Sequence, residues 1–341
     1  MEHKINLNKY NIRTDLVMEL VKDDSIVNTI EDDNVGITTV NVEKDVSKQI
    51  GKKEGVYVTI NFDDITDFES REKVGRMLQN EIEKMLKRLN IKEYWECMII
   101  GLGNIKSTPD ALGPLVIQNI IVTRHLFNLN ANIKEGFRKV SAIVPGVMGI
   151  TGIETSDVIK AIVNEVKPDF IITIDSLAAF SIDRVNKTIQ MTDTGIHPGS
   201  GIGNYRKEIS KETIGIPVIA IGVPTVVESA TIVNDTINYL FKHISYIKNN
   251  LDTNKLSVRR FGNYKEKIEN NKLSNVEKKQ LIGMLGDLND DDKHALILEV
   301  LNSINYNLMV TPKEIDFIVE KLSDCIASAI NNSLHRQITH F

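Results

Sequence analysis

The sequence predicts an α/β fold in which a mostly parallel β-sheet carries helices on both faces, with a small helical insertion. Two observations support this. Short, β-branched and almost continuously apolar segments recur along the chain, and segments with a helical spacing of apolar residues alternate with them. Strands that are apolar on both faces are typical of parallel sheets covered by helices on both sides. With 341 residues, the chain can bury one large core or two smaller ones.

Regular structure is expected to begin near Val56. Residues 1–50 are polar, and we expect them to form an irregular extension that is either wrapped on the main body or detachable from it. The segment 56–62 (VYVTINF) is short and β-branched, as strands are. The next segment, 68–90, places its apolar residues on one helical face.

The alternation of strands and helices continues through the middle of the chain. An extra strand is expected at 184–191, and a glycine-rich loop at 193–204 interrupts the pattern. Thr155 or Ser156 is the expected N-cap of the helix that begins there. The other expected strands lie at 97–103, 141–147, 169–176 and 217–224, and the other expected helices at 110–127, 155–166 and 226–244.

The composition changes in the C-terminal third. A very polar stretch followed by two helical patterns predicts a small helical insertion at about 249–307. After it, 311–334 is expected to form a long amphipathic helix. Thr311 is its expected N-cap, with Pro312 at the first position and Glu314 completing a capping box.

Bulk properties narrow the class of protein. The net charge is −5, whereas proteins that bind nucleic acid usually carry an excess of basic residues. No direct nucleic-acid partner is therefore expected. The polar N-terminus is unlike a signal peptide, and no segment approaches the ~18 apolar residues of a membrane span, so we expect a cytoplasmic protein without a membrane partner. Cys97 and Cys325 lie outside any Cys/His cluster, which predicts buried thiols and no metal site.

Two aspartates lie where a parallel sheet of this kind binds ligands. Asp175 ends the apolar segment FIITID, and Asp110 follows the segment MIIGLG across a short loop. Because crossover connections are right-handed, the carboxyl ends of both strands meet at one sheet edge, and the two side chains can meet there. Asp110 also fits the ordinary role of stabilising a helix start. Asp175 is harder to explain structurally, because a carboxylate after an apolar strand bears a desolvation cost.

Two carboxyl groups at close range can hydrolyse a peptide bond. They cannot both ionise easily, so one keeps its proton. The ionised carboxylate can take a proton from water while the protonated carboxyl hydrogen-bonds the scissile carbonyl. Such a pair titrates as a unit, and which aspartate acts as the acid stays open.

The glycine-rich loop Gly195–Gly203 offers a second candidate site. Its backbone amides could cradle an anion, although the loop lacks the GK[ST] ending of a phosphate-binding loop. It could equally act as a substrate-binding flap. His197 lies inside this loop, where a surface or structural histidine is the more common case.

Several long segments resemble the germination protease family, and they occur in the family's order. The N-terminal segment 10–19 (YNIRTDLVME) also resembles the family's processing region. The other matching segments are 101–114 (GLGNIKSTPDALGP), 144–155 (VPGVMGITGIET), 168–179 (PDFIITIDSLAA), 188–204 (TIQMTDTGIHPGSGIGN), 217–227 (PVIAIGVPTVV) and 311–335.

The resemblance implies an aspartic-type endopeptidase without a cofactor, with a fold similar to that of hydrogenase-maturation endopeptidases. Family members are made as inactive zymogens that remove a short pro-segment by self-cleavage. Here this implies a pro-segment 1–15, cleavage between Asp15 and Leu16, and a single peptidase domain over 16–341 that includes the insertion.

The resemblance also assigns residues and partners. The family's essential aspartates match Asp110 and Asp175. Its substrates are small acid-soluble spore proteins cut after an acidic residue, and its members are homotetramers in the cytoplasm of the forespore and spore core.

The sequence departs from the family at Phe180, where an arginine is common. If that arginine reads the acidic substrate residue, Arg184 or Arg206 would have to replace it here, and His197 is a further candidate contact.

Two other functions stay open at this point. A metal-dependent peptidase of the hydrogenase-maturation type would use Asp110 and Asp175 as ligands, with His197 as the third. A non-catalytic anion- or nucleotide-binding module would use the Gly195–Gly203 loop instead.

Overall fold

The structure is a computed structural model, and its description covers residues 14–21, 27–32, 35–129, 133, 135–199, 206–249 and 264–336. The chain divides into two compact units. Among the described residues, the larger unit takes those within 13–179, 183–226 and 311–341, and the smaller unit takes those within 180–182 and 227–310.

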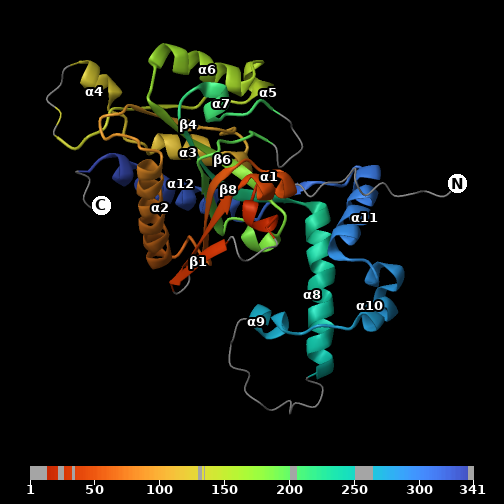
Figure 1. The fold of residues 1–341 in the computed structure, drawn as a ribbon. Coiled ribbons are helices and arrows are strands. Elements are labelled where there is room, and N and C mark those ends of the chain that lie inside the picture. Colours follow the sequence, from red (N-terminus) through yellow and green to blue (C-terminus); the bar gives the residue numbers. More distant parts are fainter. Residues whose placement is uncertain are drawn as a thin grey trace. The chain divides into compact units, whose positions relative to one another are not determined.

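The larger unit is built on a β-sheet (Figure 1), and its strands follow the order β1-β2-β3-β7-β8-β6-β4-β5. The short strand β9 (Met309–Val310) pairs with Val227 and Glu228 at the end of β8, and these residues belong to the smaller unit. The other strands are β1 (Val27–Asp32), β2 (Val35–Val42), β3 (Gly55–Phe62), β4 (Cys97–Gly101), β5 (Val140–Ile143), β6 (Phe170–Ala179), β7 (Thr188–Thr192) and β8 (Val218–Glu228).

The α/β class is confirmed, but the sheet is mixed rather than mostly parallel. Strand β4 pairs in parallel with β5 and β6. In contrast, β1, β2, β3, β7 and β8 pair antiparallel in succession. Parallel pairing is therefore found around β4, where the two candidate aspartates lie.

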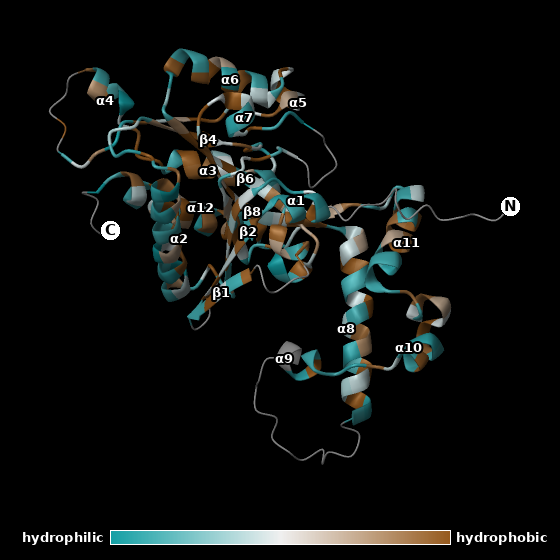
Figure 2. Cartoon of the chain, viewed as in Figure 1, coloured by the Kyte–Doolittle hydropathy of each residue, from teal (hydrophilic) through white to brown (hydrophobic). Residues whose placement is uncertain are grey.

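Helices cover both faces of the sheet, as predicted. Alternate side chains of a strand point to opposite faces. Ile99 accordingly packs in a core with α2, α3 and α12, whereas Met98 and Ile100 pack against α6. Hydrophobic residues gather along the central strands, and α2 carries hydrophilic residues on its outer surface (Figure 2). The helices of this unit are α1 (Lys44–Ile50), α2 (Phe68–Arg88), α3 (Leu112–Gln118), α4 (Arg124–Asn128), α5 (Met148–Thr151), α6 (Thr155–Val166), α7 (Lys211–Ile214) and α12 (Ile315–Leu334).

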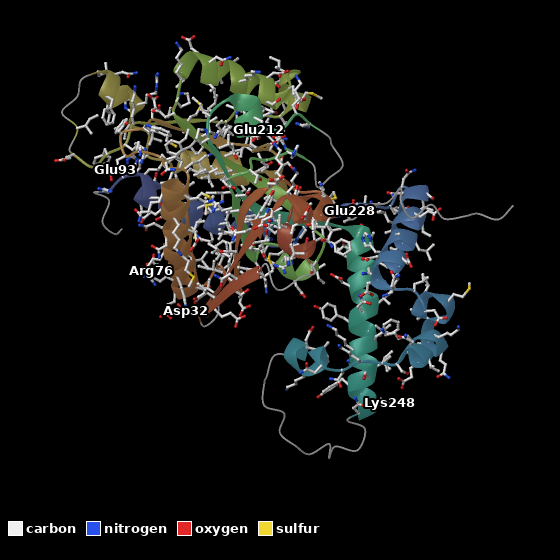
Figure 3. All side chains as sticks on the ribbon, viewed as in Figure 1. Asp32, Arg76, Glu93, Glu212, Glu228 and Lys248 are labelled. Carbon is white, nitrogen blue, oxygen red and sulfur yellow. The ribbon has the colours of Figure 1, made fainter. Side chains whose placement is uncertain are left out.

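The expectation of an irregular extension over residues 1–50 was wrong for part of that range. Strands β1 and β2 form a hairpin that extends the sheet beyond β3, and α1 follows it. Val40 and Val42 pack with Val17 in a separate small core. The exposed end of β1 is tied to α2 by an ion pair of 3.0 Å between Asp32, labelled in Figure 3, and Lys73.

The helix expected over 110–127 is interrupted. Thr123 is buried between α3 and α4 and does not continue the helix. Its hydroxyl donates to the Arg138 carbonyl at 2.6 Å and accepts from the Val140 amide at 2.9 Å. Hydrogen bonds to the neighbouring strand thus replace the helical ones, which no local pattern could show.

Two predicted helix starts also differ from the structure. Helix α12 begins at Ile315 with Glu314 as its N-cap, because the Thr311 hydroxyl donates instead to the Thr225 carbonyl at 2.8 Å. Helix α6 begins at Thr155, but its N-cap is Glu154 rather than Thr155 or Ser156.

Where it is described, the smaller unit consists mainly of helices, together with β9 and the end of β8 that pairs with it. Lys248 of α8, labelled in Figure 3, forms an ion pair with Glu277 of α10. Phe180 packs edge-on against the ring of His294, with ring centroids 4.7 Å apart. The polar stretch at 250–263 lies outside the described residues. The helices of this unit are α8 (Ser229–Asn249), α9 (Tyr264–Glu269), α10 (Asn275–Ile282) and α11 (Asp290–Ser303).

Candidate active site

Asp110 is held by a glycine-rich loop that packs tightly against the sheet. A Cβ atom on Gly103, whose φ is +110°, would lie 2.1 Å from the Asp110 carbonyl oxygen. A Cβ atom on Gly101 would lie 2.3 Å from the Gly113 carbonyl oxygen, at the start of α3. Only glycine permits such close approach, so these glycines fix the position of Asp110 beyond the end of β4.

Hydrogen bonds close the same loop. The Asn104 amide donates to the Asp110 carbonyl at 2.9 Å, and the Asp110 amide donates to the Ser107 carbonyl at 2.7 Å. The Thr225 hydroxyl holds the Pro109 carbonyl at 2.6 Å. The loop is therefore anchored to β8 as well as to β4.

Asp175 lies within β6, which continues to Ala179 instead of ending at the aspartate. In the parallel pairing of β4 and β6, Ile174 is the partner of Gly101, so Asp175 follows directly at the edge where the Asp110 loop begins. The Asp175 side chain is 5% exposed. One carboxylate oxygen accepts the amide of Ser176 at 2.9 Å.

Both carboxyl groups are shifted toward the protonated form. Burial raises the pKa of Asp110 to about 6, against the opposing effects of the Asn104 backbone and Arg206. Burial also raises the pKa of Asp175 well above its usual value, and the negative charges of Asp110 and Asp15 raise it further. A charge effect of Asp110 on Asp175 requires the two side chains to be near each other.

The segment around Asp15 is bound to β6, the strand that carries Asp175. The Asp15 amide donates to the Ala178 carbonyl at 3.1 Å, and the Ala178 amide donates to the Asp15 carboxylate at 2.9 Å. Leu16 and Val17 are completely buried. The bond between Asp15 and Leu16 is therefore held at the end of β6, the strand that carries Asp175.

Lys52 and Gln190 contact the backbone on both sides of this bond. The Gln190 amide nitrogen donates to the Asp15 carbonyl at 3.0 Å, and the Gln190 amide oxygen accepts from the Val17 amide at 2.7 Å. The Lys52 ammonium donates to the Thr14 carbonyl at 3.0 Å and to the Asp15 carbonyl at 3.4 Å. The sequence did not single out either residue. Gln190 shares one face of the alternating strand TIQMT with Thr188 and Thr192, a pattern typical of any strand with one polar face, so the sequence contains no signal that marks it.

A cavity of about 300 Å³ opens next to this segment. Asp15, Lys52 and Gln190 line it, together with Arg206 and His197. Among the described residues, Asp110 and Asp175 are not part of its lining. The link to them is electrostatic, because the charges of Asp15 and Arg206 both act on Asp175.

The three residues expected to bind substrate have different surroundings. Arg184 pairs with Glu19 at 3.7 Å and donates to Asn61 at 3.2 Å, so it contacts the segment that follows the Asp15–Leu16 bond. Arg206 lines the cavity and acts electrostatically on both Asp110 and Asp175. Residues 200–205 of the glycine-rich loop lie outside the described residues.

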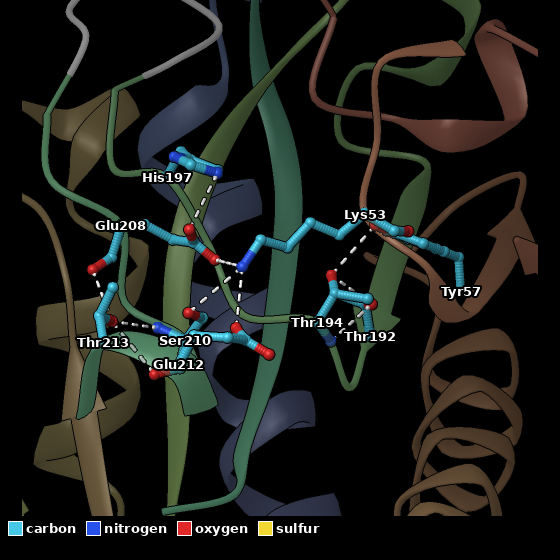
Figure 4. A network of polar contacts seen from close by, with 9 residues as sticks. All are labelled: Lys53, Tyr57, Thr192, Thr194, His197, Glu208, Ser210, Glu212 and Thr213. Atoms are coloured by element: carbon cyan, nitrogen blue, oxygen red, sulfur yellow. Dashed lines mark hydrogen bonds and ion pairs between the residues drawn. The ribbon is translucent and has the colours of Figure 1, made fainter. Parts of the chain in front are cut away.

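His197 lines the cavity, and its side chain is 52% exposed. Its ring nitrogen is 3.8 Å from a Glu208 carboxylate oxygen. The same glutamate pairs with Lys53, which also binds Glu212 at 2.8 Å (Figure 4). Across the part of the chain that the structure describes, no group of three His, Cys, Asp or Glu side chains is placed to hold a metal ion.

Comparison with known proteins decides the family. The family model for germination protease matches residues 8–340. The chain belongs to the germination protease family. It is an endopeptidase of spore germination, and the alternative of a non-catalytic module is excluded.

Individual relatives match along nearly the whole chain. The germination protease of Bacillus cereus (strain ATCC 10987 / NRS 248) is 46% identical over 359 aligned residues, which cover 99% of this chain and 97% of that protein. The germination protease of Bacillus anthracis (strain A0248) is 46% identical over 360 aligned residues, with the same coverage.

A solved structure with partial similarity is a [NiFe] hydrogenase maturation protease, HycI, from Thermococcus kodakarensis. It is 19% identical, with a TM-score of 0.27, and the match covers 41% of this chain and 80% of that one. Within the described residues, none of the helices has the length and apolar character needed to cross a bilayer.

Proposed function

We propose that the chain is made as a zymogen that hydrolyses its own Asp15–Leu16 bond, with Asp110 and Asp175 activating the water. The observation that supports this most is the position of Asp15. Its backbone is hydrogen-bonded to Ala178 on the strand of Asp175, and its charge acts on the Asp175 carboxyl group.

The chemistry follows from the shifted carboxyl groups. One aspartate is ionised and removes a proton from water, and the other is protonated and later donates a proton to the leaving amine of Leu16. The site suits these two roles, because burial of both carboxyl groups and the repulsion between their negative charges favour a pair that holds one proton. The two groups titrate as a unit, so the acid and base roles belong to the pair.

We assign residues 1–15 as a pro-segment and residues 16–341 as the peptidase domain, with the helical insertion at about 249–307. Residues 1–13 lie outside the described part of the chain. The buried side chains of Leu16 and Val17 suit residues that remain bound after cleavage. Asp15, held at its carboxylate by the Ala178 amide, suits an enzyme that cuts after acidic residues.

The substrates of the processed enzyme would be the small acid-soluble spore proteins, in the cytoplasm of the forespore and spore core. A substrate's acidic residue would take the place that Asp15 occupies before processing. Arg206 and His197, which line the adjacent cavity, would contact the substrate there. Arg184 would contact a substrate residue that follows the cleaved bond, at the place that Glu19 occupies before processing. We propose a homotetramer as the working assembly.

Incubation of the purified full-length chain near pH 6, about which Asp110 titrates, tests the proposal. Mass spectrometry should detect a product that begins at Leu16. A chain that stays intact, or that is cut at another bond, would refute the processing assignment.

The alternative of a metal-dependent peptidase that uses Asp110, Asp175 and His197 finds no support in the described residues, because these three side chains do not form a group placed to hold a metal ion. The difference between the two lies in the requirement for a divalent ion. Self-cleavage that stops in excess chelator and resumes on addition of a divalent ion would favour this candidate over the aspartic mechanism.

A further inference from the structure

The carbonyl group of the Asp15–Leu16 bond is already bound by two donors before any reaction. We infer that Lys52 and Gln190 form an oxyanion-stabilising site, in which the Lys52 ammonium and the Gln190 amide polarise the Asp15 carbonyl and hold the negative charge that develops on its oxygen. This inference rests on the proposed self-cleavage, and it adds two catalytic residues to the aspartate pair.

Gln190 is oriented for this role by its second hydrogen bond. Its amide oxygen accepts from the Val17 amide at 2.7 Å, and an N–H group can bond only to the oxygen of a side-chain amide. The nitrogen must therefore face the Asp15 carbonyl, 3.0 Å away. Gln190 lies in the middle of β7, which is paired on both sides, at Thr59 of β3 and Gly222 of β8. A donor on a central strand is held rigidly, as transition-state stabilisation requires.

Lys52 supplies the charge. Its ammonium lies 3.4 Å from the Asp15 carbonyl oxygen and 3.0 Å from the Thr14 carbonyl oxygen. Burial lowers the pKa of Lys52, while the carboxylates of Asp15 and Glu19 act in the opposite direction. A cation in such a partly desolvated place interacts with a new negative charge more strongly than it would in water. Its long contact to a neutral carbonyl can shorten as the oxygen becomes negative.

The hydrolysis balances with these groups in place. The water oxygen attacks the Asp15 carbonyl carbon, the water proton passes to the ionised carboxylate, and the carbonyl electron pair moves onto the oxygen between Lys52 and Gln190. When the C–N bond breaks, that electron pair re-forms the carbonyl. As this bond breaks, the protonated carboxyl group donates its proton to the Leu16 nitrogen, which gives an α-carboxyl group on Asp15 and a new amino terminus.

A purely anchoring role for the two residues makes a different prediction. If they only hold the segment, their loss should slow cleavage in proportion to the loss of binding. If they stabilise the oxyanion, their loss should slow cleavage while the segment stays in place. Removal of one oxyanion donor typically lowers a rate by a factor of about 10² to 10³.

The test uses the full-length chain and follows the formation of the product that begins at Leu16. Lys52→Met removes the charge but keeps the length of the side chain. Gln190→Glu removes the donor but keeps an acceptor for the Val17 amide. Both variants should process roughly 100-fold more slowly than the wild-type chain. Lys52→Arg, which restores a cation, should process faster than Lys52→Met.

Matched controls use exposed residues of the same types. Lys160→Met on α6 and Gln280→Glu on α10 should process at the wild-type rate. Hydrogen exchange at the Leu16 and Val17 amides, measured in an Asp175→Asn background in which cleavage is blocked, shows whether the segment stays bound. We expect the protection of these amides to be retained in Lys52→Met.

The outcomes separate the two proposals. A wild-type chain that never cleaves at Leu16 would refute the proposed function. A wild-type chain that cleaves, together with a Lys52→Met variant of equal rate, would refute only the oxyanion site. A Lys52→Met variant whose amide protection falls by the same factor as its cleavage rate would also refute the oxyanion site, because anchoring alone would then explain the slower cleavage.

Discussion

Replacement of Asp110 by asparagine should impair self-cleavage and at the same time stabilise the fold at neutral to alkaline pH. The folded-state pKa of Asp110 is raised from its ordinary value of 3.8 to about 6, with burial as the main cause. A carboxyl group with a raised pKa binds its proton more tightly in the folded state than in the unfolded state. Its ionisation therefore costs stability as the pH rises from about 3.8 to about 6, and the full cost remains above that range.

The magnitude follows from the difference between the two pKa values. A difference of 6 − 3.8 corresponds to about 3 kcal/mol of free energy of unfolding. Asp110 is only partly buried, so solvent screening reduces this, and we expect about 1.5 kcal/mol. Asparagine keeps the shape of the side chain but never ionises. Asp110→Asn should therefore be more stable than the wild type by about this amount above pH 6, and by little near pH 3.8.

Urea unfolding followed by tryptophan fluorescence measures this difference. The chain contains a single tryptophan, Trp95, which lies in the larger unit and reports on its unfolding. The matched control is Asp64→Asn, which replaces a carboxyl group whose pKa is lowered rather than raised. Hydrogen bonds from Thr66 lower the pKa of Asp64, so its replacement should not stabilise the protein at any pH.

The reasoning about Asp110 fails if its replacement destabilises the protein above pH 6, or if any gain is independent of pH. Either result would mean that its carboxyl group is not held in a desolvated position. A variant that processes at the wild-type rate would separately remove Asp110 from the reaction.

Three further predictions concern the aspartate pair. Asp175→Asn should fold normally by circular dichroism but lower the self-cleavage rate by a factor of about 10² to 10⁴, since it removes a proton-transfer group of the pair; processing at more than a hundredth of the wild-type rate would contradict this. The self-cleavage rate should rise with pH as the pair loses its first proton, near the pKa of about 6 to which burial raises Asp110, and fall at higher pH as the pair loses its second proton, with Asp15 and Arg206 as the other charges acting on it; a rate that does not vary with pH would be inconsistent with an aspartate pair. Excess chelator should leave the rate unchanged, and a loss of cleavage that zinc or nickel restores would favour the metal-dependent mechanism.

The pairing of β4 with β6, which places their carboxyl ends at one edge, could be predicted because it depends on local rules. Apolar strands of the β4 and β6 type are recognisable from their composition, and parallel neighbours place their carboxyl ends at one edge. The register of Gly101 opposite Ile174 follows this expectation. In contrast, β1 and β2 were missed and the antiparallel pairing of β3, β7 and β8 was not predicted, although buried positions of β2 alternate with less buried ones from Thr38 to Val42, as is typical of a half-buried strand.

The contacts around the Asp15–Leu16 bond could not be predicted in this way. Lys52, Gln190 and Ala178 come from three separate parts of the chain and meet only in the tertiary structure. The interruption of the predicted helix at Thr123 has the same cause, because its hydrogen bonds go to the strand that contains Val140. Such long-range polar contacts leave no periodic pattern in the sequence.

An experimental structure of the full-length Asp175→Asn chain tests the central claim most directly. We predict that Asp110 and the amide at position 175 approach each other closely enough to share one water molecule, beside a carbonyl of Asp15 that is bound by Lys52 and Gln190. Two side chains separated by packed apolar groups, or an Asp15 carbonyl that faces away from both, would contradict the proposed chemistry.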